Sequence, residues 1–107
     1  MSRAVIPVER IKAPLVLIAG DDDGLWPSAP MAREIMARRR RLGGSSSDTL
    51  LEYAGAGHLI AKAYLPGGTT VVGGGRLETG GSPAANASAQ ADSWPKVLGF
   101  LRRNLER

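Results

Sequence analysis

The clearest hydrophobic feature of the chain is a continuous apolar run at residues 15–20, in which apolar and polar positions do not alternate. A strand buried on both faces has this pattern, and parallel sheets covered by helices supply such strands. Residues 49–54 form a second, shorter strand candidate. With a helix predicted between them, the order strand, helix, strand favours a right-handed crossover and places the chain in the α/β class.

The segment between these strands has the pattern of an amphipathic helix that begins at Ser28 and ends near Leu42. Ser28 can cap the first turn, and Pro30 lies in that turn, where a missing backbone N–H does no harm. Gly43 and Gly44 provide a stop at the carboxyl end. The helix has one apolar face, formed by Met31, Ile35 and Leu42 with Ala32 and Met36 beside them.

Residues 62–83 are rich in glycine and predict a long surface excursion with a short extended piece at residues 69–72. A glycine-rich phosphate loop is the sharper alternative. Neither the Walker pattern nor the dinucleotide fingerprint with its following helix is present, so the excursion is the favoured interpretation.

The last segment, residues 84–105, predicts helix. Pro95 either kinks one continuous helix or begins a second one after a cap at Asp92 and Ser93. Helical spacing places one apolar face toward the sheet, formed by Trp94, Val97, Leu98, Leu101 and Leu105.

Size and composition limit the chain to one small domain or a part of one, because it has 107 residues, 43% of them apolar. It contains no cysteine, which excludes disulfides, thiolate metal sites and a cysteine nucleophile and fits a reducing, cytoplasmic setting. No apolar run approaches the roughly 20 residues that span a bilayer. We expect a soluble protein with no membrane contact and no metal or other cofactor.

The net charge is +4, and four consecutive arginines occupy positions 38–41. Such a run could contact phosphate, but it has no interleaved aromatic residues and no zinc-finger or helix-turn-helix pattern. The favoured interpretation is a solvated helix end, where arginine suits the negative end of the helix dipole. Nucleic acid is therefore not an expected partner.

His58 is the only histidine, in a small-residue loop at residues 55–60 directly after the second strand. Asp23 lies in an acidic turn directly after the first strand. Because parallel strands end at the same edge of a sheet, the two side chains can meet if the strands are neighbours. An imidazole held by a carboxylate is the base of a catalytic triad. Turn formation and solvation account for Asp21 and Asp22.

Four blocks in order, at residues 6–12, 20–28, 55–60 and 89–94, resemble the C-terminal domain of the acyl-CoA thioesterase and bile acid-CoA:amino acid N-acyltransferase family. The resemblance covers nearly the whole chain. It implies an α/β-hydrolase domain that cleaves or transfers the acyl group of an acyl-CoA thioester through an acyl-enzyme. By position, Asp23 corresponds to the triad acid and His58 to the triad base.

The chain departs from this family in lacking the nucleophile, because no Gly-x-Ser/Cys-x-Gly elbow occurs in it. Ser28 and Ser93 are better explained as helix caps. We therefore expect residues 1–107 to be a single partial α/β-hydrolase domain, a fragment of late strands and helices that is inactive alone. Its open sheet edge predicts a homodimer or another association.

Two other functions remain open at this point. One is a different α/β-hydrolase class, such as a dienelactone hydrolase or a peptidase-like esterase, since acid and histidine loops recur across that superfamily. The other is a non-enzymatic interaction module that uses the arginine run against an anionic surface.

Overall fold

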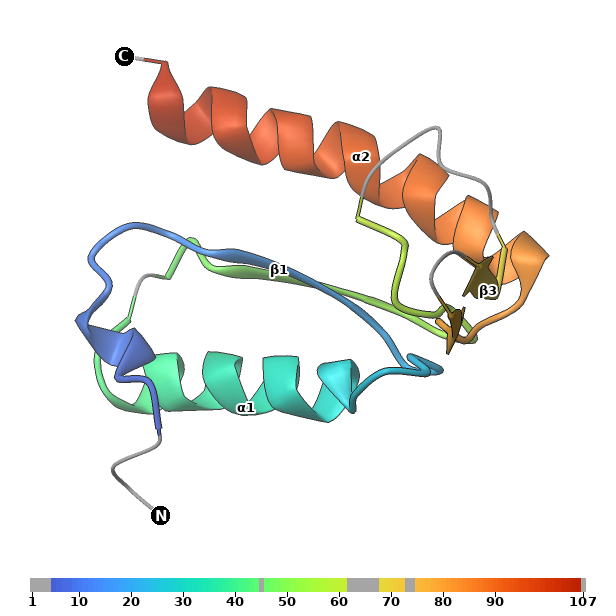
Figure 1. Cartoon of the computed structure of the whole chain (residues 1–107). Helices are drawn as coiled ribbons and strands as arrows, with labels where there is room; N and C mark the ends of the chain where they lie inside the picture. The colour runs from blue at the N-terminus through green and yellow to red at the C-terminus, as the bar shows by residue number, and fades with distance from the viewer. Residues whose placement is uncertain (1–4, 45, 62–67, 73–74, 107) are drawn as a thin grey trace.

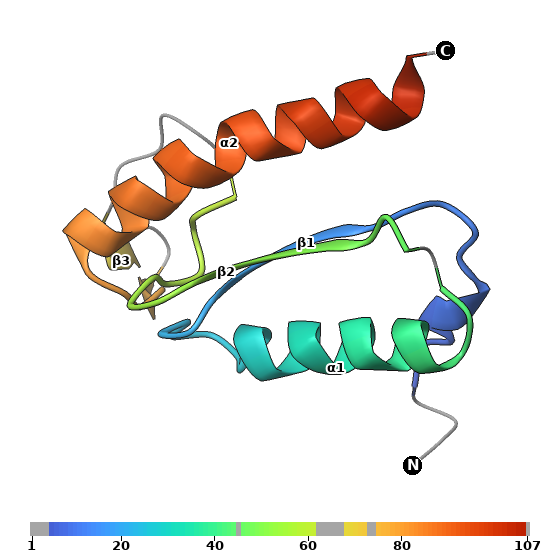
Figure 2. The ribbon, with the colours of Figure 1, turned by 180° about the vertical axis from the view of Figure 1, so that it is seen from behind.

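A two-stranded parallel sheet lies between two helices in the computed structural model, which describes residues 5–44, 46–61, 68–72 and 75–106 (Figure 1). In chain order the elements are a 3-10 turn η2 (Val8–Arg10), strand β1 (Val16–Gly20), helix α1 (Ser28–Arg41), strand β2 (Thr49–Tyr53), strands β3 (Thr70–Val72) and β4 (Arg76–Glu78), and helix α2 (Pro83–Leu105). Seen from behind in Figure 2, the helices again lie on opposite faces of the sheet. The chain is a small α/β protein, as the hydrophobic pattern predicts.

Strands β1 and β2 pair in parallel, from Val16 opposite Thr49 to Gly20 opposite Tyr53. The predicted order of strand, helix and strand is thereby confirmed, with each strand slightly shorter than expected. Burial is greatest at the carboxyl end of β1, where Ala19 is 2% exposed. Since both strands run the same way, the loops that follow them begin at the same edge of the sheet.

Helix α1 packs on the sheet through small residues, with Ala29 and Ala32 buried against Ala19, Leu17 and Leu50. The predicted apolar face is wrong for two of its members, because Met31 and Leu42 are 50% and 49% exposed. Alanine allows the helix to approach the strands closely, and a face of long side chains would hold it away.

The beginning of α1 also differs from the prediction. Pro27 occupies the cap position and makes no side-chain cap, while Ser28 is the first helical residue. The Ser28 hydroxyl instead donates to the carbonyl oxygen of Gly20 at 3.2 Å. Ser28 therefore fastens the helix to the end of β1 and does not cap it.

The solvated arginine end predicted for α1 is wrong for Arg39, which is 0% exposed. Its Nε and Nη2 bind the two carboxylate oxygens of Asp48 at 2.6 and 2.9 Å. The remaining donors bind the carbonyl oxygens of Val8, Ile11 and Ala13. A guanidinium buried on this scale must have all its donors satisfied, and the irregular segment before β1 supplies the acceptors.

Helix α2 is one continuous helix with Pro95 inside it. Ser82 caps it, accepting a hydrogen bond from the backbone N–H of Ala85 at 3.1 Å. Ser93, predicted to be a cap, is buried and donates to the carbonyl oxygen of Ile60. The predicted apolar face is also largely wrong, since the side chains of Leu98, Leu101 and Leu105 are 46%, 41% and 74% exposed.

The glycine-rich excursion contains a small antiparallel hairpin, in which Thr70 of β3 lies opposite Glu78 of β4. The extended piece predicted at residues 69–72 is confirmed, while residues 62–67 and 73–74 lie outside the described residues. The end of the excursion is not at the surface, because Thr79 is 1% exposed. No helix in the described part of the chain is long and apolar enough to cross a membrane.

Candidate active site

Asp23 lies in the turn after β1, and this turn fixes the orientation of its carboxylate. Its Oδ1 accepts hydrogen bonds from the backbone N–H groups of Leu25 at 2.8 Å and Trp26 at 3.3 Å. An aspartate that binds the backbone two or three residues later closes a turn on itself. The side chain is only 3% exposed. Its second oxygen, Oδ2, takes no part in these two bonds and can bind a neighbouring side chain.

His58 provides that side chain, with Nδ1 at 2.9 Å from Oδ2 of Asp23 although the residues are 35 positions apart. The backbone N–H of His58 donates to the carbonyl oxygen of Thr79 at 2.8 Å, which holds the loop after β2 in place. The expected meeting of the two side chains is thus found in the structure. Their catalytic role stays a prediction.

The contact with Asp23 sets the tautomer of the His58 ring. An ionised carboxylate only accepts hydrogen bonds, so Nδ1 carries the proton and Nε2 of the neutral ring keeps its lone pair. Within the described part of the chain, no hydrogen bond is made to Nε2. The side chain is 27% exposed. A group arriving from outside could therefore give its proton to Nε2.

The pKa of the Asp23 carboxyl is held below its usual value, which keeps it ionised at neutral pH. Burial acts in the opposite direction and raises this pKa. Four hydrogen bonds together outweigh burial because they stabilise the charged form, and they come from His58, the backbone N–H groups of Leu25 and Trp26, and the side chain of Ser28. The carboxylate can thus hold the imidazole and stabilise a positive charge that develops on it.

Trp26 covers one side of the His58 ring. The two rings form an edge-to-face contact, with centroids 5.1 Å apart and an interplanar angle of 82°. Edge-to-face packing is the favoured geometry for aromatic pairs, so the contact orients the imidazole from a second direction. Sequence reasoning missed this residue, although an aromatic residue within an acidic turn after a strand is a signal that could have found it.

A third segment, after β4, joins the two loops of the site. The carbonyl oxygen of Thr79 accepts hydrogen bonds from Gly24 N–H at 3.1 Å and from His58 N–H at 2.8 Å. The next residue, Gly80, forms an antiparallel bridge with Asp23. The acid loop and the histidine loop are therefore both attached to one short stretch of backbone. The sequence pattern identified this stretch only as part of a surface excursion.

The other two aspartates of the turn bind loop backbone. Oδ1 of Asp21 accepts from the N–H of Gly55 at 2.6 Å, and Oδ2 of Asp22 accepts from the N–H of Gly81 at 3.1 Å. These bonds differ from the local turn chemistry expected of the two residues, because they reach backbone 34 and 59 positions away, and they fasten the three segments of the site together. In the described residues, no three His, Cys, Asp or Glu side chains gather so that they could hold a metal ion.

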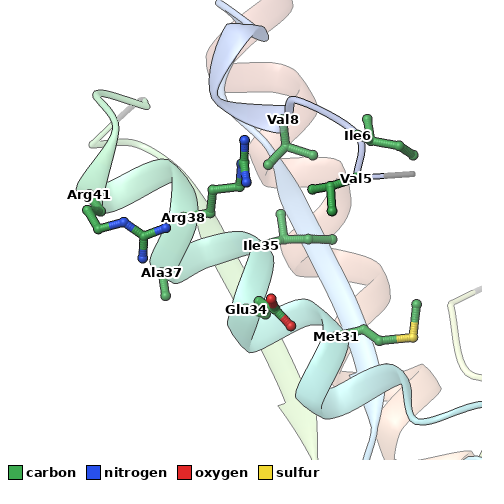
Figure 3. A pocket seen from close by; sticks show the side chains of 9 residues that line it. All are labelled: Val5, Ile6, Val8, Met31, Glu34, Ile35, Ala37, Arg38 and Arg41. Carbon is green, nitrogen blue, oxygen red and sulfur yellow. The ribbon is translucent and has the colours of Figure 1, made fainter. Parts of the chain in front are cut away.

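Two of the surface hollows matter for the site: a small one beside it and a larger one away from it. One, of about 290 Å³, is lined by Gly20, Asp23 and Trp26 and by the first turn of α1. A larger groove of about 410 Å³ lies between α1 and the segment before β1, and Met31, Ile35 and Arg38 are among its lining residues (Figure 3). Neither Asp23 nor His58 lines the larger groove.

The fold and site define a class of α/β protein in which an acid and a histidine meet after two neighbouring parallel strands. The family model described as BAAT / Acyl-CoA thioester hydrolase C terminal matches residues 1–107, and the chain belongs to this family. This confirms the resemblance seen in the four sequence blocks.

Curated relatives agree with this assignment. The chain is 36% identical over 107 residues to mouse acyl-coenzyme A amino acid N-acyltransferase 1, and 33% identical over 106 residues to mouse acyl-coenzyme A thioesterase 2, mitochondrial. These matches cover 97% and 96% of the chain but 26% and 23% of the relatives. Mouse peroxisomal succinyl-coenzyme A thioesterase is 30% identical over 105 residues, covering 95% of the chain and 25% of that relative.

The chain thus spans about a quarter of the length of the curated relatives it matches. The names of two relatives place them in mitochondria and in peroxisomes. The cytoplasmic location expected from the absence of cysteine therefore stays a prediction.

Proposed function

We propose that His58 and Asp23 are the base and acid of a catalytic triad that cleaves or transfers the acyl group of an acyl-CoA thioester. The observation that carries the proposal is the 2.9 Å contact between Nδ1 and Oδ2 at the shared edge of two parallel strands. The relatives named as acyl-CoA thioesterases and N-acyltransferases support the substrate class. The order of the two residues along the chain, acid before histidine, is that of α/β-hydrolases and supports the same roles.

In this proposal the nucleophile is a serine or cysteine outside the 107 residues, since the chain has no elbow motif. Nε2 of His58 takes the nucleophile's proton as the nucleophile attacks the thioester carbonyl carbon. The carbon–sulfur bond then breaks, and the imidazolium returns the proton to the departing CoA thiolate. Water or an amine next gives a proton to Nε2 and attacks the carbonyl carbon of the acyl-enzyme. The bond between the acyl group and the nucleophile then breaks, and the imidazolium returns the proton to the nucleophile.

Asp23 holds the ring with Nε2 facing the reaction and stabilises the imidazolium in each half of the cycle. Its lowered pKa supports this role, because the carboxylate stays charged while the ring gains and loses a proton. Trp26 supports it as well by packing on the ring.

The family assignment favours this function over another α/β-hydrolase class. An interaction module that uses the arginine run has less basis, because Arg39 is buried and Arg38 is paired with Glu9 at 2.6 Å. Only Arg40 and Arg41 of that run are exposed.

A graft tests the proposal directly. The segment of mouse acyl-coenzyme A thioesterase 2 that matches this chain is replaced by the chain, and hydrolysis of an acyl-CoA is followed by release of free thiol. We expect activity in the graft and a loss of about 10²–10⁴-fold in kcat for His58→Gln and Asp23→Asn. Glu52→Gln is the matched control, because Glu52 is a carboxylate at the end of β2 that pairs with Arg33 on the outside.

The expected result is full activity in the Glu52→Gln graft. A His58→Gln graft that keeps its activity would contradict the proposal, and so would a folded but inactive graft of the unchanged chain. The 107-residue chain tested alone should hydrolyse acyl-CoA no faster than buffer. Turnover that disappears on His58→Ala in that chain would show that it holds its own nucleophile.

A further inference from the structure

Helix α2 carries a polar stripe on its buried side, formed by Asn86, Gln90 and Ser93. Their spacing puts them on one face of the helix, and they are 1%, 5% and 0% exposed. Nε2 of Gln90 donates to the carbonyl oxygen of Leu59 at 3.0 Å, and Oγ of Ser93 donates to that of Ile60 at 3.2 Å. Buried polar groups are stable only when they are paired, and here the loop after β2 provides the partners.

Asn86 differs from the other two because its amide binds three backbone segments at once. Its Oδ1 accepts from the backbone N–H of Gly57 at 2.8 Å. Its Nδ2 donates to the carbonyl oxygens of Gly80 at 3.2 Å and Gly68 at 3.3 Å. One buried side chain therefore joins the loop after β2 to the segment after β4.

We propose that Asn86 is a positioning residue that holds His58 in register with Asp23. Gly57 immediately precedes His58 in the chain, and Gly80 is bridged to Asp23. The amide of Asn86 thus fixes the distance between the backbones on which the two side chains stand. The inference rests on the proposed function, which gives His58 and Asp23 their catalytic roles.

The contacts demand the chemistry of a primary amide. Gly57 offers a donor and Gly80 a carbonyl acceptor, so the side chain between them must both accept and donate. An aspartate would match Gly57 but would turn a carboxylate oxygen toward the carbonyl oxygen of Gly80. A carbon added at Gly57 would collide with the carbonyl oxygen of Gly80, so the two segments pack in direct backbone contact at this point.

Proton NMR of the 107-residue chain tests the inference through the hydrogen-bonded Nδ1–H of His58. In the unchanged chain we expect a downfield signal that exchanges slowly with water. In Asn86→Asp the protection of this proton should fall about tenfold, because the two hydrogen bonds that Nδ2 donates to Gly80 and Gly68 are lost and a repulsive contact replaces them. Gln90→Met is the control. It removes a buried hydrogen bond of a side-chain amide on the same helix, and it leaves the Asn86 link between Gly57 and Gly80 in place.

Equal protection of the Nδ1 proton in Asn86→Asp and in the unchanged chain would overturn the inference. A loss as large in Gln90→Met would also overturn it, because the effect would then be general loosening of α2. Urea denaturation gives the unfolding midpoint of each variant. The protection of the Nδ1 proton is then compared at urea concentrations that lie equally far below each variant's midpoint.

A measurement on the unchanged chain keeps the test independent of any variant that fails to fold. Asn86 binds the N–H of Gly57, and the N–H of Gly24 in the acid loop binds the carbonyl oxygen of Thr79. If the amide of Asn86 couples the two loops, the N–H groups of Gly57 and Gly24 should exchange with water through one shared opening. Hydrogen exchange should then give both groups the same opening free energy and the same dependence on urea. Separate openings would contradict the inference.

The outcomes of the graft and of the NMR experiment are separable. A graft that keeps its activity with His58→Gln removes the catalytic role and the proposed function. Unchanged Nδ1–H protection in Asn86→Asp removes the role of Asn86 and leaves that function standing.

Discussion

The carboxylate of Asp48 forms a two-point ion pair with the buried guanidinium of Arg39, with N–O distances of 2.6 and 2.9 Å. Asp48 also accepts the backbone N–H of Leu15 at 2.9 Å, directly before β1. The hydrogen bond with Arg39 and the N–H of Leu15 lower the pKa of Asp48 even though burial raises it. The pair therefore fixes the starts of both strands relative to the end of α1.

Removing one partner of this pair should destabilise the chain strongly. In Asp48→Asn the guanidinium of Arg39 keeps its charge without a counter-ion in a buried site, and we expect a loss of about 3–5 kcal/mol in the free energy of unfolding. Urea denaturation followed by circular dichroism measures it. Arg40→Ala is the control, since Arg40 is an exposed neighbour on the same helix. An Asp48→Asn chain as stable as this control would contradict the prediction.

The pair of Glu9 and Arg38 should make stability depend on pH. The hydrogen bond from Arg38 is the main cause that lowers the pKa of Glu9 from 4.5 to about 2. Because the folded pKa lies below the unfolded one, the contribution is complete above about pH 4.5 and is lost as pH falls toward 2. In Glu9→Gln this pH-dependent contribution to the free energy of unfolding is absent.

Unfolding midpoints measured between about pH 6 and pH 2 should therefore show a gap between the unchanged chain and Glu9→Gln that closes in acid. Other carboxylates with lowered pKa titrate in both proteins, so the difference isolates Glu9. Glu78→Gln should give a smaller gap, because the pair of Arg76 and Glu78 is 73% and 60% exposed and is screened by solvent. A gap for Glu9→Gln that stays constant with pH would refute this account.

Gly80→Ala should disrupt the junction between the acid turn and the segment after β4. Its φ is +83°, and an added Cβ would collide with the carbonyl oxygen of Asp22. We expect a loss of more than about 1 kcal/mol in urea denaturation, with weaker protection of the Nδ1 proton of His58. Gly43→Ala separates the two causes, because Gly43 also has a positive φ of +91° but has open space around it. Equal losses of stability in Gly80→Ala and Gly43→Ala would contradict the prediction, because the collision at Gly80 would then add no cost.

The open edges of the two-stranded sheet predict that the chain self-associates. In the described residues each strand of the main sheet has one neighbour, so each presents an open edge. Apolar side chains such as those of Val72 and Leu105 are 78% and 74% exposed as well. We expect size-exclusion chromatography to show a dimer or larger species at micromolar concentration. A monomer that persists at all concentrations tested would disprove it.

The hydrophobic pattern predicted the central part of the fold well because its signals are local. An unbroken apolar run at β1, a helix ended by Gly43 and Gly44 and a second short strand left few arrangements, and parallel pairing followed from chain order. The same order placed Asp23 and His58 at one edge of the sheet. Their side-chain contact depended on one further condition, that the two strands are neighbours, and the structure meets it.

The helical faces were predicted poorly because burial of polar residues depends on partners far away in the chain. Arg39 was expected at a solvated helix end, and no sequence pattern marked Asn86. Arg39 is buried because three carbonyl oxygens and the carboxylate of Asp48 surround its guanidinium. Asn86 is buried because the N–H of Gly57 and the carbonyl oxygen of Gly80 face it and bind its side-chain amide.

The sequence by itself determined the α/β class and the family and predicted that Asp23 and His58 lie at one edge of the sheet, since each depends on residue order along the chain. Only the tertiary structure decided what holds that pair in place. The third segment at Thr79, the ring of Trp26 and the amide of Asn86 reach the site from separate parts of the chain. Their roles come from distances across the fold, which spacing along the sequence does not encode.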